Sequence, residues 1–215
     1  MSDARLPERA AQRSLAVGAQ EAAAMTIVQS ELVVGGQKSG KSRRAQDLAT
    51  RWLQGAASRR AVLIATAVAH DPDMRARIRR HQLDREQQTP RLASIEVPVE
   101  LAAGIATNSR PDTLVVVDCL TLWLMNLVWP SGVDDSDAQL ADCSAATTAL
   151  IDAIDRAPGP LVLVSNEIGL GVVPLGRASR AFVDALGGLN QAVARACARV
   201  TMMASGLPLV LKAPP

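Results

Sequence analysis

The sequence predicts an α/β fold in which helices flank a mostly parallel β-sheet. Two observations predict it. Short apolar runs rich in β-branched residues alternate with helical patterns along the 215-residue chain, and most of these runs are apolar almost without interruption. Strands with a continuous apolar pattern are expected to be covered on both faces, as in parallel sheets built from βαβ units.

The elements are expected in the following order along the chain. Strands are predicted at 30–34, 61–66, 113–118 and 161–165, with a weaker strand at 92–97. Residues 200–205 and 208–212 flank Gly206 and predict a C-terminal β-hairpin. Helices are predicted at about 41–53, 72–86, 98–107, 120–128, 137–156 and 177–198. This alternation of strands and helices is typical of a sheet with helices on both faces.

Residues 28–215 are expected to form a single domain, preceded by a flexible extension over residues 1–27. The extension is alanine-rich and contains acidic as well as basic side chains, without the apolar core of a signal peptide. The longest apolar stretch, at 114–129, contains Asp118, Thr121 and Asn126 and is shorter than a membrane span. We therefore expect no membrane span.

The composition disfavours nucleic acid as a partner. There are 23 Lys and Arg residues against 21 Asp and Glu residues, and only 2% of the residues are aromatic. Proteins that bind nucleic acid usually present a strong positive field, and those that bind single strands also need aromatic side chains. The three cysteines are odd in number and widely spaced, which fits neither a disulfide framework nor a zinc cluster. A cytoplasmic location is expected.

A glycine-rich turn joins the first predicted strand to the first predicted helix. It satisfies the pattern G-x-x-x-x-G-K-[ST] with Gly35, Gly36, Gln37, Lys38, Ser39, Gly40, Lys41 and Ser42. Glycines let backbone N–H groups approach phosphate oxygens, and the helix N-terminus adds a partial positive charge. Lys41 is expected to reach the β- and γ-phosphates. The motif predicts a P-loop NTPase (RecA-like) fold; the alternative is an ordinary glycine turn capped by Ser39 or Ser42.

A magnesium site is expected where the third long apolar strand ends. Mg²⁺ bound by the Ser42 hydroxyl and phosphate oxygens normally needs an acidic partner from a neighbouring strand. Asp118 ends such a strand. A buried carboxylate there would be costly without a cation or hydrogen bonds, so its position favours a site at the carboxyl ends of the sheet. The alternative is a helix N-cap, and both roles are compatible.

The strand at 161–165 also ends in polar residues, Ser165, Asn166 and Glu167. A glycine-bearing loop follows, and then Arg177 and Arg180 begin a long helix. Loops at the carboxyl edge of an open α/β sheet are where substrates bind. The two arginines are one helical turn apart and either clamp a second phosphate or are simply solvated.

His81 ends a basic helical segment that includes Arg77 and Arg80. A neutral imidazole is a competent nucleophile toward phosphorus near pH 7, and neighbouring guanidinium groups favour the neutral form. A phosphate that approached His81 would meet positive charge. The alternative is an ordinary surface histidine in a charged helix.

Several motifs occur in an order and spacing that resemble one enzyme family. They are GGQKSGKSRRAQ, IATA, DPDMRARIRRH with Arg85 four residues on, VVVDCLTLWLMNLV, VSNEIGLGVVPLGRASR and LNQ at 189–191. Over residues 31–212 the chain resembles the bifunctional adenosylcobinamide kinase/adenosylcobinamide-phosphate guanylyltransferases of cobalamin biosynthesis. The resemblance implies phosphorylation of adenosylcobinamide by ATP or GTP, and then transfer of GMP from GTP onto the new phosphate with release of pyrophosphate.

The resemblance also implies roles for individual residues. His81 matches the guanylylated histidine, and Asp118 matches the acidic residue at the strand end. The nucleotide site would further include Ala65, Thr66, Ala67, Gln82, Leu83, Asp84, Arg85 and Glu96, in addition to residues 35–42. The stretch between His81 and Glu96 is two residues longer than is common in the family and lacks its usual Trp. Members tend to form homo-oligomers in which one subunit completes another's site.

Two other functions are compatible with the motifs. One is a P-loop kinase for another small metabolite, in which His81 has no catalytic role. The other is a RecA-like ATPase that binds nucleic acid through the basic segment, and this would show salt-sensitive binding to DNA or RNA. Neither of these alternatives would transfer a guanylyl group from GTP, so an assay for that reaction distinguishes both of them from the bifunctional enzyme. The base for the acceptor hydroxyl is left open, with Glu167 as a candidate.

Overall fold

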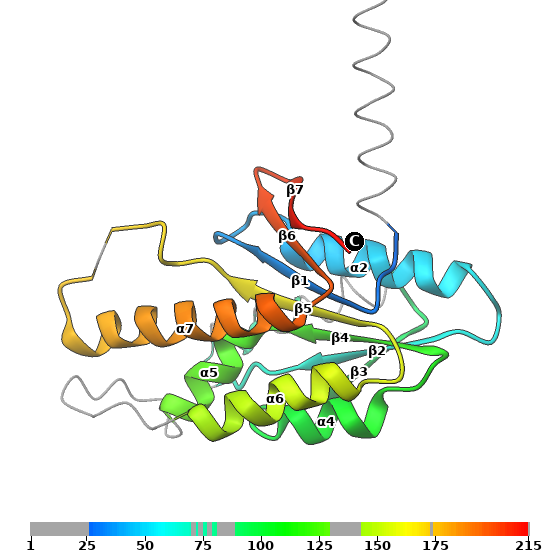
Figure 1. Ribbon diagram of the computed structural model, residues 1–215, viewed down its shortest axis with the longest axis horizontal. Helices are drawn as coiled ribbons and strands as arrows, with labels where there is room; N and C mark the ends of the chain where they lie inside the picture. Colours follow the sequence, from blue (N-terminus) through cyan, green and yellow to red (C-terminus); the bar gives the residue numbers. More distant parts are fainter. Residues whose placement is uncertain are drawn as a thin grey trace, which may run out of the picture.

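The computed structural model describes residues 26–69, 72, 75, 76, 79, 80, 89–129, 143–172 and 174–214. They form a seven-stranded sheet with the order β3-β2-β4-β5-β1-β6-β7 (Figure 1). The strands are β1 (Ser30–Gly35), β2 (Arg60–Ala65), β3 (Leu92–Glu96), β4 (Thr113–Asp118), β5 (Leu161–Asn166), β6 (Arg199–Ala204) and β7 (Leu207–Lys212). Neighbouring strands are parallel except for β7, which is antiparallel to β6.

The described helices are α2 (Lys41–Gln54), α4 (Leu101–Asn108), α5 (Leu120–Val128), α6 (Ser144–Arg156) and α7 (Arg177–Ala196). The predicted α/β fold, a mostly parallel sheet flanked by helices with a C-terminal β-hairpin, is confirmed, and each predicted strand is present to within one residue at either end. The helix predicted from 98 begins only at Leu101. The Leu101 N–H donates to the Val99 carbonyl at 2.8 Å, a three-residue turn that keeps residues 98–100 out of the helix. Most of the helix predicted at 72–86 lies outside the described residues.

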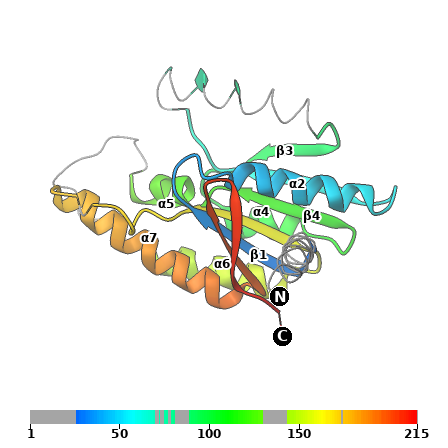
Figure 2. The ribbon, with the colours of Figure 1, turned by 90° about the horizontal axis from the view of Figure 1, so that it is seen from above.

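Helices cover both faces of the sheet. Figures 1 and 2 show α2 on one face, and α4, α5, α6 and α7 on the other. The two faces of β4 pack into different cores: Val115 and Val117 lie with residues from α4 to α7, whereas Leu114 and Val116 lie with residues of α2. This alternation follows from the period of two in strands. The same alternation decides whether a side chain at a strand end lies on the α2 face of the sheet or on the face covered by α4 to α7.

The parallel strands bring their carboxyl ends to one edge of the sheet. Register places Asn166 of β5 beside Gly35 of β1, and Asp118 of β4 beside Ala65 of β2 and Val164 of β5. Glu96 of β3 lies next to Ala65. The ends of five strands therefore converge here, and three of them carry polar side chains, as expected for an open α/β sheet. None of the described helices is long and apolar enough to cross a membrane.

Candidate nucleotide-binding site

The turn between β1 and α2 has a backbone that only glycine accommodates at two points. Gly35 has φ 152° and Gly40 has φ 102°, both in the region that L-residues rarely adopt. A Cβ on Gly35 would lie 2.5 Å from the Met203 carbonyl oxygen and 2.7 Å from Ser39 Oγ. The Gly206 N–H donates to the Ser39 carbonyl at 3.0 Å. The β6–β7 turn thus supports the glycine-rich turn from outside, and no side chain fits at Gly35.

Lys41 opens α2 directly after this turn. Its Nζ donates a hydrogen bond to the Gly36 carbonyl at 2.7 Å, so the ammonium lies over the turn. The N-cap residue is Gly40, and no side chain caps the helix. The alternative of a turn capped by Ser39 or Ser42 is therefore wrong. A helix start with a positive dipole end and an adjacent ammonium favours an anion such as a triphosphate.

Asp118 lies on the same side of the sheet as α2. Because Leu114 and Val116 face α2, the alternation of strand side chains directs Asp118 to that face as well. Cys119, joined to Asp118 by a cis peptide bond, is the N-cap of α5, and no side chain caps that helix. The N-cap alternative for Asp118 is therefore wrong. Within the described part of the chain, its carboxylate has no hydrogen-bond or ion-pair partner.

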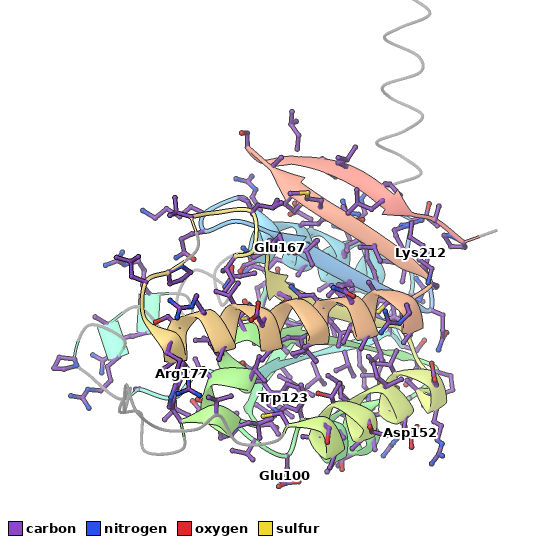
Figure 3. All side chains as sticks on the ribbon, turned by 60° about the vertical axis from the view of Figure 1, so that its left-hand side comes forward. Glu100, Trp123, Asp152, Glu167, Arg177 and Lys212 are labelled. Atoms are coloured by element: carbon purple, nitrogen blue, oxygen red, sulfur yellow. The ribbon has the colours of Figure 1, made fainter. Side chains whose placement is uncertain are left out.

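The end of β5 lies between the glycine-rich turn and Asp118, because β5 lies between β1 and β4 in the sheet. The Glu167 N–H donates to the Gly35 carbonyl at 3.0 Å, which continues the β1–β5 ladder to the glycine-rich turn. Glu167 Oε1 accepts from the Gly169 N–H at 3.0 Å. At the start of α7, the Arg180 guanidinium donates to the carbonyls of Pro174 and Leu175. Arg180 therefore orders its own loop. Arg177 is exposed at the beginning of α7 (Figure 3).

Residues 65–67 follow β2 at the same edge. The Thr66 hydroxyl donates to the Cys119 carbonyl at 2.7 Å and accepts from the Cys119 N–H at 2.9 Å. Thr66 is completely buried, so its hydroxyl ties the end of β2 to α5 and is not available to a ligand. Ala65 and Ala67 are half-buried, and Glu96 is exposed at the end of β3.

The predicted nucleophile and the residues after it, His81, Gln82, Leu83, Asp84 and Arg85, lie outside the described residues. The segment before them is described in part. Arg75, Arg79 and Arg80 are exposed there.

The thiol beside Asp118 is not reactive. Burial, and to a smaller extent the Asp118 carboxylate, raise the pKa of Cys119 to about 11. A thiol with such a pKa stays protonated near neutral pH and is neither a good nucleophile nor a good metal ligand. The chemistry at this edge therefore depends on oxygen and nitrogen groups.

Two polar helix residues that position the site were not assigned from the sequence. Thr121 Oγ1 of α5 accepts from the Asn166 N–H at 2.9 Å, and Asn190 Nδ2 of α7 donates to the Asn166 carbonyl at 3.0 Å. Each lies on an otherwise apolar, buried helix face. That pattern was the available signal, because a buried polar side chain needs a hydrogen-bond partner.

Comparisons with known proteins agree with this site. A family model described as cobinamide kinase/cobinamide phosphate guanyltransferase matches residues 31–211. The bifunctional adenosylcobalamin biosynthesis protein CobP of Pseudomonas aeruginosa is 42% identical over 186 residues, which cover 86% of this chain and 98% of that protein. The bifunctional adenosylcobalamin biosynthesis protein CobU of Escherichia coli is 34% identical over 187 residues, which cover 84% of this chain and 98% of that protein.

Among solved structures, the flagellar accessory protein FlaH of Methanocaldococcus jannaschii has a TM-score of 0.47 at 11% identity, over 86% of this chain and 79% of that chain. That similarity is too low to support a functional conclusion. The sequence matches are extensive, because the family model covers most of the chain and includes the glycine-rich turn, Asp118 and the end of β5. The chain belongs to the cobinamide kinase/cobinamide phosphate guanyltransferase family.

Proposed function

We propose that this chain phosphorylates adenosylcobinamide and then transfers GMP from GTP to the resulting phosphate, giving adenosylcobinamide-GDP and pyrophosphate. The observation that supports this most directly is the glycine-rich turn. It places the Lys41 ammonium over the Gly36 carbonyl at a helix start. The Asp118 carboxylate, which has no partner among the described residues, lies on the same face of the sheet. Such an arrangement suits a nucleoside triphosphate.

For the kinase reaction, residues 35–42 would hold the triphosphate, and Lys41 would neutralise charge on its outer phosphates. The Ser42 hydroxyl and the Asp118 carboxylate supply the hard oxygen ligands that Mg²⁺ prefers, and Asp118 has no competing partner among the described residues. When bound, Mg²⁺ would offset the charge of the phosphates. The acceptor is the hydroxyl of the aminopropanol arm, and ATP or GTP is the donor. Glu167 is the candidate base, although its Oε1 already accepts from the Gly169 N–H.

For the guanylyl transfer, His81 would attack the α-phosphorus of GTP, form a phosphoramidate with GMP and displace pyrophosphate. The phosphate of adenosylcobinamide phosphate would then attack the same phosphorus and release the imidazole. Ala65, Ala67, residues 82–85 and Glu96 would contact this nucleotide, whereas the buried Thr66 would hold the end of β2 in place. Arg75, Arg79 and Arg80 are exposed just before His81 in the sequence and supply positive charge for the incoming phosphates.

The test uses GTP labelled at the α-phosphate, with cobinamide phosphate as acceptor. The wild-type chain should form an adduct that is labile in acid and stable in alkali, and the label should then pass to the acceptor. His81→Ala should form no adduct, because the only proposed nucleophile is gone. An adduct that persists in His81→Ala would contradict the assignment of His81. Absence of transfer by the wild-type chain would contradict the guanylyltransferase function.

The proposal also covers the domain organisation, the oligomeric state and the cellular location of the enzyme. Residues 28–215 act as one domain, and the chain works as a homo-oligomer on small-molecule substrates, without nucleic acid. Cys119, Cys143 and Cys197 are free thiols, which supports a cytoplasmic location. Size measurement in solution tests the oligomer.

A further inference from the structure

We propose that Asn166, at the carboxyl end of β5, is a positioning residue for the hydrated Mg²⁺ of the bound nucleotide, through its side-chain oxygen Oδ1. This inference rests on the kinase half of the proposed function and adds to it a residue that the P-loop motif does not include. Two observations support the inference: Asn166 Oδ1 is buried without a hydrogen-bond partner among the described residues, and Asn166 lies on the face of the sheet that α2 covers.

The main chain around Asn166 is held from three directions. Its N–H donates to Thr121 Oγ1 of α5 at 2.9 Å, and its carbonyl accepts from Asn190 Nδ2 of α7 at 3.0 Å. Ser165 Oγ lies 2.6 Å from Asn190 Oδ1, and both residues are buried. The next N–H, that of Glu167, donates to the Gly35 carbonyl. Two side chains from different helices thus fix this strand end, while the Asn166 side chain takes no part in holding it.

The Asn166 side chain points toward the phosphate-binding turn. In β5, Val162 and Val164 pack into the core under α2, whereas Leu161 and Leu163 pack into the opposite core. Strand alternation therefore directs Asn166 to the face of α2, the same face as Asp118. In the sheet, β5 lies between β1 and β4. Asn166 is thus placed between the glycine-rich turn and the Asp118 carboxylate.

The Asn166 oxygen has no partner where it lies. Oδ1 is buried from solvent and accepts no hydrogen bond from any described group, and the same is true of Ser39 Oγ in the turn. Buried polar atoms in native proteins are almost always hydrogen-bonded. Four buried side-chain atoms lack a hydrogen-bond partner among the described residues, the other two being Trp129 Nε1 and Arg199 Nε. Asn166 Oδ1 and Ser39 Oγ are the two that lie beside the phosphate-binding turn, where a ligand would supply the missing partners.

The chemistry of Oδ1 narrows the choice of ligand group. An amide oxygen accepts hydrogen bonds, so a phosphate oxygen is not a suitable partner. Mg²⁺ keeps several of its waters when it binds phosphates and one or two protein ligands, and these waters are donors. A water of that shell satisfies Oδ1, and such outer contacts orient the ion and its ligands. Asn166 would act on the reaction only through the ion.

The experiment measures binding of the β,γ-imido analogue of GTP in a His81→Ala background, where no nucleotide becomes attached to the protein. Each variant is titrated once with Mg²⁺ and once with EDTA. Asn166→Leu has a similar volume and no acceptor, and Asn166→Asp keeps the acceptor oxygens. We expect Asn166→Leu to bind the Mg²⁺ complex about 10-fold more weakly, with unchanged affinity in EDTA, because loss of an outer contact to a metal typically has this effect. Asn166→Asp should retain binding of the Mg²⁺ complex.

A thermal melt without nucleotide tests the rival view that Asn166 is structural. Because Oδ1 has no partner among the described residues, Asn166→Leu should melt at the same or a higher temperature than the parent. Asn108→Leu is the control, since its Nδ2 donates to the Gly104 carbonyl within α4 and its loss should lower the melting temperature. The proposal is overturned if Asn166→Leu binds the Mg²⁺ complex as tightly as the parent, weakens equally in EDTA, or melts clearly lower. Cobinamide phosphorylation by the wild-type chain is scored separately, so failure of the proposed function would be visible on its own.

Discussion

The two edges of the sheet differ in how their polar side chains are satisfied. Toward the amino ends of β1 and β6, Glu31 is buried with only 1% of its surface exposed. Its Oε1 accepts from Arg44 Nη2 at 2.7 Å and from Thr201 Oγ1 at 2.8 Å, and Oε2 lies 3.6 Å from Arg199. A buried carboxylate with several donors ties α2, β1 and β6 together.

The C-terminus of α7 is satisfied at the same edge. Lys212 of β7 donates to the carbonyls of Ala194, Arg195 and Cys197 at 3.1, 2.8 and 2.6 Å. Figure 3 shows Lys212 beyond one end of α7 and Arg177 at the other. Carbonyls at a helix C-terminus otherwise lack partners, and a cation there also complements the helix dipole.

The carboxyl edge differs because three of its polar groups have no partner among the described residues. The Asp118 carboxylate, Asn166 Oδ1 and Ser39 Oγ accept nothing within the described part of the chain, although two of these atoms are buried. Buried polar atoms without partners are rare in folded proteins and contribute no stability, so their position at this edge favours a role in binding. The amino edge also contains one buried side-chain atom without a hydrogen bond to a described residue, Arg199 Nε. The comparison teaches that surrounding donors, and not polarity alone, separate the Glu31 carboxylate from the acceptor atoms of the ligand site.

The largest expected effect comes from breaking the satisfied cluster. Glu31→Ala leaves the buried Arg44 without its carboxylate and should lower the free energy of unfolding by about 3–5 kcal/mol, the usual cost of removing one partner of a buried ion pair. Chemical denaturation measures it. The control is Asp152→Ala, which removes an exposed ion pair of 3.7 Å to Arg156 and should cost less than about 1 kcal/mol. Equal effects of the two substitutions would contradict the structural role of the cluster.

An effect of intermediate size is expected at the carboxyl edge of the sheet, where a substitution should change nucleotide affinity and leave the stability of the fold unchanged. Lys41→Ala should weaken binding of the imido GTP analogue about 30- to 150-fold, because a charged hydrogen bond to phosphate is worth about 2–3 kcal/mol. Titration calorimetry measures the affinity. Arg43→Ala, an exposed residue of the same helical turn, should bind as the wild type does. If Lys41→Ala bound the analogue normally, the glycine-rich turn would not be the phosphate site.

The smallest effect concerns the amino edge at alkaline pH. Burial raises the pKa of Cys197 to about 12, so the folded chain keeps a thiol proton that the unfolded chain loses near pH 9. The stability from this group is fully present below about pH 9 and is lost as the pH rises toward 12. Denaturation curves from pH 8 to 11 should therefore show a decline in unfolding free energy that is shallower in Cys197→Ala. Parallel declines in the two proteins would show that Cys197 is not responsible.

Local patterns in the sequence were enough to predict the strands and the phosphate-binding turn. The continuous apolar run of β4 predicted a strand covered on both faces, and Gly35 and Gly40 predicted a backbone open to phosphate. Local signals sufficed because the period of two and the glycine requirement at positive φ depend only on neighbouring residues. The helix boundaries were less certain, since α4 begins at Leu101, three residues after the predicted start.

The sequence by itself thus determined the fold class, the family and the phosphate-binding turn. Only the tertiary structure decided which polar residues are satisfied. Glu31 meets Thr201 across 170 positions of the chain, and Asn166 lies beside Gly35 because β5 enters the sheet next to β1. Strand order is a long-range property, and a hydrogen bond forms only when its two groups come within about 3 Å of each other. No local pattern distinguishes Asn166, with its unsatisfied oxygen, from Asn190, whose amide is fully engaged.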